Sequence, residues 1–324
     1  MDPTATPKRV TYVVSNELAK IASLLPSNKI RSAVVHSLVK SYRLLDAKEY
    51  PQLQIIQPDP ATRADLCSYH DADFVDALLT EDNDSELDST FGLDHDCPRF
   101  DGLRRYVELT AGATLSAARL LRDKTTDIGI VWDGGRHHAQ KSKAEGFCYV
   151  NDCVLSVLAL RRLGRVLYLD IDLHFADAVS AAFPPPTTAA RPNVLVLSLH
   201  HAASGFYPAV PPSSSATLPL LAGTSARTIA RIWLEGIEPV IQAFGPEAVV
   251  VQCGADGLAG DPYRVWNWSL GGPGGMGWII QRVLHLNHPT LLLGGGGYHN
   301  ANTARAWAYL TSIAVSRWTI SCEI

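Results

Sequence analysis

Residues 165–178, RVLYLDIDLHFADA, decide the fold and carry the first sign of chemistry. An apolar run at 166–169, typical of a buried strand, leads into Asp170, Asp172 and His174 at alternate positions. Because alternate side chains of an extended backbone share a face, these three groups can converge. Two carboxylates and an imidazole at the end of a buried strand are costly without a cation. The alternative is a polar loop that caps the next helix, and a short motif alone does not decide between the two.

Short apolar runs alternate with helical periodicity along the rest of the chain. We expect strands at 10–14, 55–56, 127–132, 166–169, 193–200, 247–253 and 290–293, and helices at 30–45, 66–79, 103–121, 152–163, 225–244, 275–286 and 302–315. Continuous apolar strands that alternate with helices indicate a parallel sheet covered on both faces. We see no repeat or linker, so residues 1–324 are expected to form a single α/β domain. The acidic segment 80–98 is expected to be a solvated loop.

The composition favours a compact globular protein that does not bind nucleic acid directly. The 324 residues are 47% hydrophobic and carry a formal net charge of −4, with Lys and Arg scattered along the chain. The sequence shows neither the roughly 18 apolar residues of a membrane span nor the apolar core of a secretory signal. Six cysteines lie far apart, which fits reduced thiols better than disulfides. We therefore expect a soluble intracellular protein.

Polar residues follow the ends of several expected strands. They are His137 and His138, then Asp170, Asp172, His174 and Asp177, then Asp256, and finally Tyr298. Open parallel sheets place their binding sites at the carboxyl ends of the strands. The separate segments therefore point to one crevice.

Asp172, His174 and Asp256 can supply three ligands to one divalent ion. Three protein ligands leave a position open for water and substrate, which is the pattern of catalytic zinc. Two carboxylates and one imidazole also suit ferrous iron, so the ligand types leave the choice between Zn²⁺ and Fe²⁺ open.

A histidine pair and a tyrosine could complete a hydrolytic site around that ion. One imidazole of His137–His138 could accept a proton from a metal-bound water and later protonate a leaving amine. Asp170 and Asp177 are natural partners that orient the rings. Tyr298 follows four glycines, and its phenol could stabilise an oxyanion. The glycines could alternatively cradle phosphate or only pack tightly, although the segment lacks the Lys-Ser/Thr of a P-loop.

Taken together, these motifs resemble a class I-type histone deacetylase of the arginase–deacetylase superfamily. The motifs are DCP at 96–98, WDGGRHHA at 132–139, GFCYVND at 146–152, YLDIDLH at 168–174, GADGLAGDP at 254–262 and GGGGY at 294–298. The match runs from about residue 29 to the C-terminus. It implies an about eight-stranded parallel sheet between helices and hydrolysis of N6-acetyl-lysine in histone or other protein tails. It also implies co-repressor partners and a place in the nucleus, the cytoplasm or both.

The resemblance gives each candidate residue a role. Zinc would be held by Asp172, His174 and Asp256, and Tyr298 would polarise the acetyl carbonyl. His138, paired with Asp177, would be the general base and then the acid, while His137, paired with Asp170, would assist electrostatically.

The resemblance also implies residues around the reacting centre. Gly146, Phe147 and Tyr207 would line a narrow substrate channel with Tyr263 at its mouth, Arg31 and Arg136 would lie at an internal channel beneath the metal, and a potassium ion would be bound by Asp170, Asp172, His174, Ser198 and Leu199. Tyr263 and Arg136 are departures, since the family usually has a smaller apolar residue and a hydrophobic residue there.

Other departures from the family pattern bear on regulation and binding. Phe175 and Ala176 replace a His and a Gly beside the ligands, without removing a ligand. The acidic rim residue that anchors the substrate backbone is matched to Arg105. The basic positions that bind inositol phosphate are matched to Asn28, Pro262 and Ala301, which argues against that regulation.

The chain stops before the C-terminal segment that the family usually carries, so we expect a shortened C-terminus.

Two other functions stay open at this point. An acetylpolyamine or other small-amide deacetylase, or a non-catalytic scaffold that binds acetyl-lysine, is compatible with the same residues.

Overall fold

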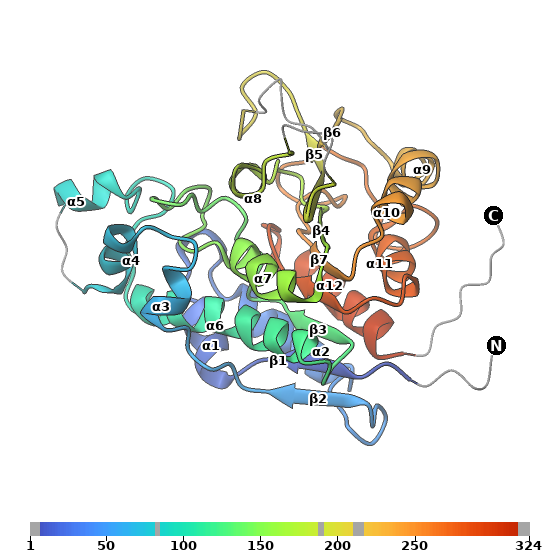
Figure 1. The fold of residues 1–324 in the computed structure, drawn as a ribbon, viewed down its shortest axis with the longest axis horizontal. Coiled ribbons are helices and arrows are strands. Elements are labelled where there is room, and N and C mark those ends of the chain that lie inside the picture. Colours follow the sequence, from blue (N-terminus) through green and yellow to red (C-terminus); the bar gives the residue numbers. More distant parts are fainter. Residues whose placement is uncertain (1–6, 82–84, 187–190, 210–216, 317–324) are drawn as a thin grey trace.

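One parallel β-sheet organises the computed structural model, which describes residues 7–81, 85–186, 191–209 and 217–316 (Figure 1). Its strands are β1 (Val10–Val13), β2 (Leu53–Ile56), β3 (Ile128–Val131), β4 (Val166–Asp170), β5 (Val194–His201), β6 (Thr217–Leu220), β7 (Ala248–Gln252) and β8 (Thr290–Leu293). The eight strands are arranged in the order β2-β1-β3-β8-β7-β4-β5-β6, and every neighbouring pair is parallel. The predicted α/β architecture with an eight-stranded parallel sheet is confirmed.

Helices cover both faces of this sheet. They are α1 (Asn16–Ala22), α2 (Arg31–Ser41), α3 (Arg63–Leu66), α4 (Ala72–Leu79), α5 (Ser85–Thr90), α6 (Leu103–Arg122), α7 (Asp152–Leu160), α8 (Asp177–Ala182), α9 (Ala226–Ile232), α10 (Glu238–Phe244), α11 (Met276–His285) and α12 (Asn300–Val315). None of the helices that the structure describes has the length and apolar character needed to cross a bilayer.

The core consists of two apolar clusters, one on each face of the sheet. One cluster includes residues of α2, α9, α10, α11 and α12, and the other includes residues of α1, α4, α6 and α7. Along β4, Leu167 and Leu169 belong to the first cluster, whereas Val166 and Tyr168 belong to the second. This alternation is the period-two geometry of a strand that is buried on both sides.

The structure corrects the expected elements in three places. Within the acidic segment that we expected to be a loop, α5 forms with Glu86 and Asp88 in its first turn, where acidic side chains favour the helix dipole. The expected helix at 66–79 is two helices, because α3 ends after one turn and α4 starts at Ala72. The edge strand β6 escaped the sequence pattern because Pro219 lies inside it, which only an edge strand tolerates.

The strand order places the polar segments side by side. β3, β8, β7 and β4 are consecutive neighbours in the sheet. The segments that follow them carry His137 and His138, Tyr298, Asp256, and Asp172 with His174, respectively. Because all four strands point the same way, these segments meet at one edge of the sheet.

We expect the central strand to govern stability. Leu169 of β4 is fully buried between β7 and β5, so Leu169→Ala should lower the free energy of unfolding by about 2–5 kcal/mol. Leu221 is 78% exposed, and Leu221→Ala should change that free energy by less than about 0.5 kcal/mol. Guanidinium denaturation of both variants checks this, and equal effects would contradict the burial pattern.

Candidate active site

Two carboxylates and one imidazole form a buried cluster at the carboxyl ends of β4 and β7. Ligand atoms of Asp172, His174 and Asp256 all lie within 4.8 Å of one another. The Nδ1 atom of His174 is 2.9 Å from Asp256 Oδ2 and 3.2 Å from Asp172 Oδ1. The structure thus brings the three predicted ligands together, with their acceptor atoms facing a common point.

The electrostatics of this cluster fit a divalent cation. Burial and the neighbouring Asp172 charge raise the pKa of Asp256 to about 7. Burial alone would lower the pKa of His174, but hydrogen bonds to Asp172 and Asp256 outweigh it and raise this pKa to about 10. Without an ion, a proton on His174 therefore offsets the two carboxylates. A divalent ion would replace that proton and neutralise both, and the donor set suits zinc or ferrous iron.

Gln252, the last residue of β7, fixes the position of Asp172. Its Nε2 donates to Asp172 Oδ2 at 2.8 Å, while its Oε1 accepts from the Gly254 amide at 2.8 Å. The Gly296 amide donates to the same Asp172 oxygen at 2.9 Å. Gln252 was not among the residues predicted from the sequence, although an amide side chain at the end of an apolar run could have indicated a functional position. These bonds leave Asp172 Oδ1 as the oxygen that faces His174.

The two predicted histidines each have a carboxylate partner. His137 Nδ1 lies 2.8 Å from Asp170 Oδ2, and His138 Nδ1 lies 2.7 Å from Asp177 Oδ1. Their ring centroids are 4.0 Å apart. The hydroxyl of Tyr168 also donates to Asp170 Oδ2, at 2.7 Å. Both rings are thus oriented through Nδ1, with Nε2 left for chemistry.

The two imidazoles differ in charge. Burial lowers the pKa of His137, but the charges of Asp170 and Asp172 outweigh it and raise this pKa to about 9. Burial and the charge of His137 lower the pKa of His138 to about 4. At neutral pH the pair therefore combines one cation with one neutral base.

Asp152, at the start of α7, holds the turn that carries the histidines. Its carboxylate accepts from the amides of Gly135 at 2.9 Å and Arg136 at 2.7 Å, and from the Thr114 hydroxyl at 2.6 Å. Gly135 has φ of +85°, and a Cβ there would collide with the Gly294 carbonyl. The backbone conformation and the close packing therefore both require a glycine at position 135 of this turn.

Aromatic rings enclose the cluster on its solvent side. Tyr263 packs edge-on against His174 at 4.8 Å and Tyr298 at 5.1 Å between ring centroids. Phe147 lies 5.8 Å from Tyr298, and Tyr207 lies 5.1 Å from His138. Gly146 belongs to the same wall, since a Cβ there would lie 2.6 Å from His138. All four predicted channel residues are therefore next to the histidines or Tyr298.

Phe206 is a further wall residue that sequence analysis missed. Its ring stacks on His174 with 5.2 Å between centroids and an interplanar angle of 11°. It precedes Tyr207, and no motif marked it. Tyr298 itself is anchored through its amide, which donates to Asp261 Oδ2 at 2.8 Å.

The match of Arg105 to the acidic rim position is wrong. Arg105 lies on α6, where it pairs with Glu17 of α1 at 2.6 Å and with Glu108 at 3.2 Å. The exposed carboxylate beside the channel wall is Asp96, whose Oδ2 accepts from the Gly146 amide at 2.8 Å. The acid of the DCP motif therefore lies beside Gly146, one of the predicted wall residues, and nine positions before Arg105.

The predicted potassium residues lie on neighbouring strands. Ser198 of β5 pairs in register with Asp170 of β4, and Leu199 follows it. Asp172 and His174 continue from the end of β4. Ser198 Oγ lies 3.1 Å from His200 Nδ1. A potassium ion at this place stays a prediction.

The two predicted internal arginines are both buried. Arg31 Nη1 donates to the Gly297 carbonyl at 2.9 Å, and its guanidinium lies 5.0 Å from the centroid of Trp307. Arg136 Nη2 donates to the Asp133 carbonyl at 3.2 Å. Both residues therefore lie directly behind segments that carry predicted catalytic groups, Tyr298 and His137.

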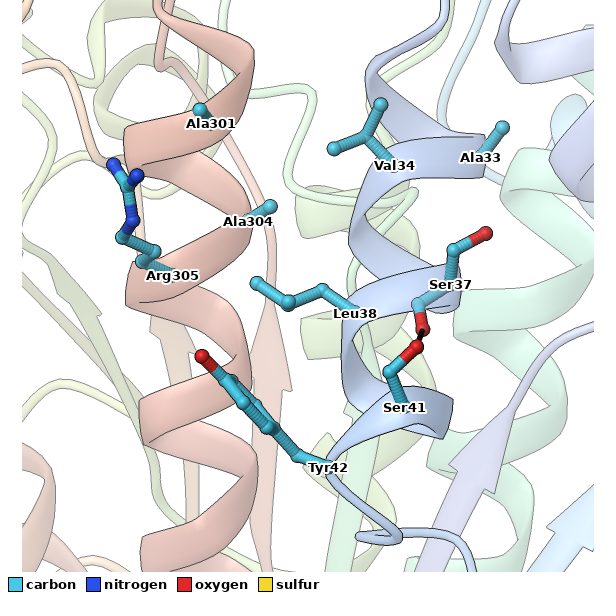
Figure 2. A pocket seen from close by; sticks show the side chains of 9 residues that line it. All are labelled: Ala33, Val34, Ser37, Leu38, Ser41, Tyr42, Ala301, Ala304 and Arg305. Atoms are coloured by element: carbon cyan, nitrogen blue, oxygen red, sulfur yellow. Dashed lines mark hydrogen bonds between the residues drawn. The ribbon is translucent and has the colours of Figure 1, made fainter.

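A surface groove between α2 and α12 is separate from this cluster (Figure 2). Its volume is about 580 Å³, and it is lined by Ala33, Val34, Ser37, Leu38, Ser41, Tyr42, Ala301, Ala304 and Arg305. Ala301, matched to an inositol-phosphate position, contributes only a methyl group, and Arg305 is the one cation among the described residues that line the groove. The groove contains no residue of the metal cluster, so we assign it no catalytic role.

The support from Gln252 should be measurable as metal affinity. Gln252→Ala removes the donor to Asp172 Oδ2, so affinity for zinc should fall about 10–100-fold. Chelator competition on purified protein measures this. Gln242→Ala, on the exposed side of α10, is the matched control and should leave the affinity unchanged. Equal affinities of the Gln252 variant and the unaltered protein would rule out this role.

Comparison with known proteins agrees with the geometry. The histone deacetylase domain model matches residues 25–314. The chain is 38% identical to histone deacetylase 8 of Xenopus tropicalis over 97% of this chain and 85% of the relative, and 36% identical to histone deacetylase 8 of Danio rerio over 100% and 86%. It is also 38% identical to histone deacetylase 2 of Oryza sativa subsp. japonica, over 90% of this chain and 58% of that relative. The resemblance inferred from the motifs is thereby confirmed, and the chain belongs to the histone deacetylase family.

Proposed function

We propose that this protein hydrolyses N6-acetyl-lysine in histone or other protein tails and releases acetate. The observation that carries the proposal is the meeting of a buried Asp-His-Asp cluster, two His–Asp pairs and Tyr298 at one edge of the sheet. Family membership supports the same chemistry. Each group has a distinct task in amide hydrolysis.

Asp172, His174 and Asp256 would hold the metal. When bound there, zinc or ferrous iron supplies Lewis-acid chemistry to the amide carbonyl and to the attacking water. Gln252 keeps Asp172 aimed at the ion. The surrounding aromatic rings exclude bulk water, which strengthens every electrostatic interaction in the site.

His138 would move the proton. Its low pKa keeps the ring neutral at neutral pH, and Asp177 on Nδ1 leaves Nε2 free to take a proton from the attacking water. The same Nε2 then returns the proton to the departing lysine amine. His137, held cationic by Asp170, would stabilise negative charge on the carbonyl oxygen.

The phenol of Tyr298 would donate a hydrogen bond to the oxyanion. Burial and the charges of Asp256 and Asp172 raise the pKa of its phenol, so the group keeps its proton as a hydrogen-bond donor. Asp261 fixes the backbone of the residue through its amide. A donor already in place at the site of developing charge needs no reorganisation during the reaction.

Phe147, Tyr207 and Tyr263 would grip the substrate. Aromatic faces on opposite sides can sandwich the four methylenes of a lysine stem. Asp96 lies beside Gly146 at the mouth and would accept backbone N–H groups of the peptide. Asp96 would thus be the acidic rim residue, in place of the position that was matched to Arg105.

The remaining features of the proposal follow from the family. A potassium ion would be bound by Asp170, Asp172, His174, Ser198 and Leu199. Acetylated histone tails as substrates would place the protein in the nucleus, and co-repressor proteins would recruit it. Neutral or apolar residues at Asn28, Pro262 and Ala301 argue against dependence on inositol phosphate.

Turnover of an acetyl-lysine peptide tests the proposal. Unaltered protein should hydrolyse a fluorogenic acetyl-lysine peptide, and Tyr298→Phe should lower turnover about 10²–10³-fold without changing the metal content. Tyr42→Phe, at an exposed position, is the matched control. Hydrolysis of acetylspermidine but not of the peptide would favour a polyamine substrate, and metal-loaded protein inactive on both would indicate a scaffold.

The rim acid should act on peptide binding rather than on chemistry. Asp96→Asn should raise KM about tenfold for a long acetylated peptide, because a hydrogen bond to a charged acceptor is lost, with little change in kcat. A minimal acetyl-lysine amide without flanking residues should show no such increase. Asp101→Asn, in the same loop, serves as the control. An equal rise in KM for both substrates would contradict a contact with the peptide backbone.

A further inference from the structure

Two buried guanidinium groups lie on the interior side of the catalytic wall. Arg31 is 3% exposed and donates to the carbonyl of Gly297, the residue before Tyr298. Arg136 is 5% exposed and immediately precedes His137. Buried arginines normally have an anionic partner, because an unpaired buried charge is costly.

Arg136 has few partners for its five N–H donors. Among the residues that the structure describes, its guanidinium donates one hydrogen bond, to the Asp133 carbonyl, and its buried Nε has no partner. The buried hydroxyl of Tyr106, which interacts electrostatically with Arg136, is likewise without a partner in that part of the chain. Unsatisfied buried polar groups in a native fold need an explanation, and an acceptor that the protein itself does not supply is one.

The nearby carboxylates are already engaged elsewhere. Asp133 Oδ2 is 2.9 Å from His36 Nε2, and the oxygens of Asp152 accept from the Gly135 and Arg136 amides and from Thr114. Among the contacts of the described residues, neither carboxylate accepts a hydrogen bond from the Arg136 guanidinium, which donates to the Asp133 carbonyl instead. The charges of both carboxylates are near Arg136, but its buried Nε has no acceptor in the described part of the chain.

The arginines lie on the side that the acyl group of a substrate would face. The lysine stem would enter past Tyr207 and Tyr263, which are 38% and 41% exposed. The acyl group would be the most deeply inserted part of the substrate, next to His137 and Tyr298. Arg136 adjoins His137 in the chain, and Arg31 donates to the residue before Tyr298. Burial and the charge of Arg136 lower the pKa of Arg31 to about 10, so both groups are still cationic at neutral pH.

We propose that Arg136, together with Arg31, binds the terminal carboxylate of a dicarboxylic acyl group, so that succinyl-type acyl-lysines are substrates of this site. The inference rests on the proposed function and extends it to a second acyl class. Water adds to the amide carbon, the C–N bond breaks, the lysine amine takes the proton, and a dicarboxylate leaves. The unsatisfied guanidinium would hold the distal carboxylate through charge-assisted hydrogen bonds.

The test compares acyl groups of equal length on one peptide sequence. We expect kcat/KM for succinyl-lysine to exceed that for butyryl-lysine about tenfold or more, since both have four carbons and only one has a carboxylate. Arg136→Leu should lower this succinyl-to-butyryl ratio roughly ten- to hundredfold, because hydrogen bonds to a charged group are lost. Arg136→Lys keeps the positive charge and should retain part of the preference for succinyl-lysine. Arg122→Leu, remote at the end of α6, should leave the ratio unchanged.

The outcomes separate this inference from the proposed function. Hydrolysis of acetyl-lysine with no preference for succinyl over butyryl, or a ratio unchanged by Arg136→Leu, would overturn the inference alone. Hydrolysis of the succinyl peptide without the acetyl peptide would overturn only the acetyl assignment. If Arg136→Leu fails to fold, calorimetric titration of the unaltered protein decides: succinate should bind about tenfold more tightly than butyrate, and equal affinities would overturn the proposal.

Discussion

The repulsion between two buried carboxylates, Asp172 and Asp256, is the constraint on which the rest of the site depends. Two negative charges without solvent are tolerated only with a cation between them. The neighbouring backbone is shaped around this pair: a Cβ on Gly254 would collide with Asp172, and a Cβ on Gly296 would collide with Asp256. Gln252 and backbone amides bind the outward oxygens. The remaining oxygens therefore face His174 and a shared ion.

Sheet topology supplies the precision that this arrangement needs. The four neighbouring strands β3, β8, β7 and β4 present their polar segments at one edge. Beneath these segments, Trp132 and Trp307 stack with 5.5 Å between centroids, and Trp307 Nε1 donates to the Cys253 carbonyl at 2.8 Å. These two contacts thus hold helix α12 against the segments that follow β3 and β7. Catalytic groups held by strands and a packed helix keep their geometry better than groups on free loops.

Apolar runs followed by polar residues predict the strands and the sheet edge where the candidate residues meet. The ligand set and the two His–Asp pairs join distant segments, and their assignment came from the resemblance to the family. The local pattern fails where the partner comes from elsewhere in the chain. Asp152 and Gln252 act on turns that lie beside them only in the folded protein. Phe206 matters because it stacks on His174. Arg105 was matched to the acidic rim position in place of Asp96. The sequence alone does not show that the loop with Asp96 folds beside Gly146, while Arg105 pairs with Glu17 of α1.

Metal titration of the stripped protein tests the central claim most directly. Zinc added to chelated protein should restore hydrolysis of an acetyl-lysine peptide in proportion to the amount bound, with saturation at about one ion per chain. Asp256→Asn, which lacks one carboxylate of the cluster, should bind far less zinc and recover little activity. Full activity in the stripped protein, or full recovery by the Asp256→Asn variant, would contradict a reaction that depends on the Asp-His-Asp site.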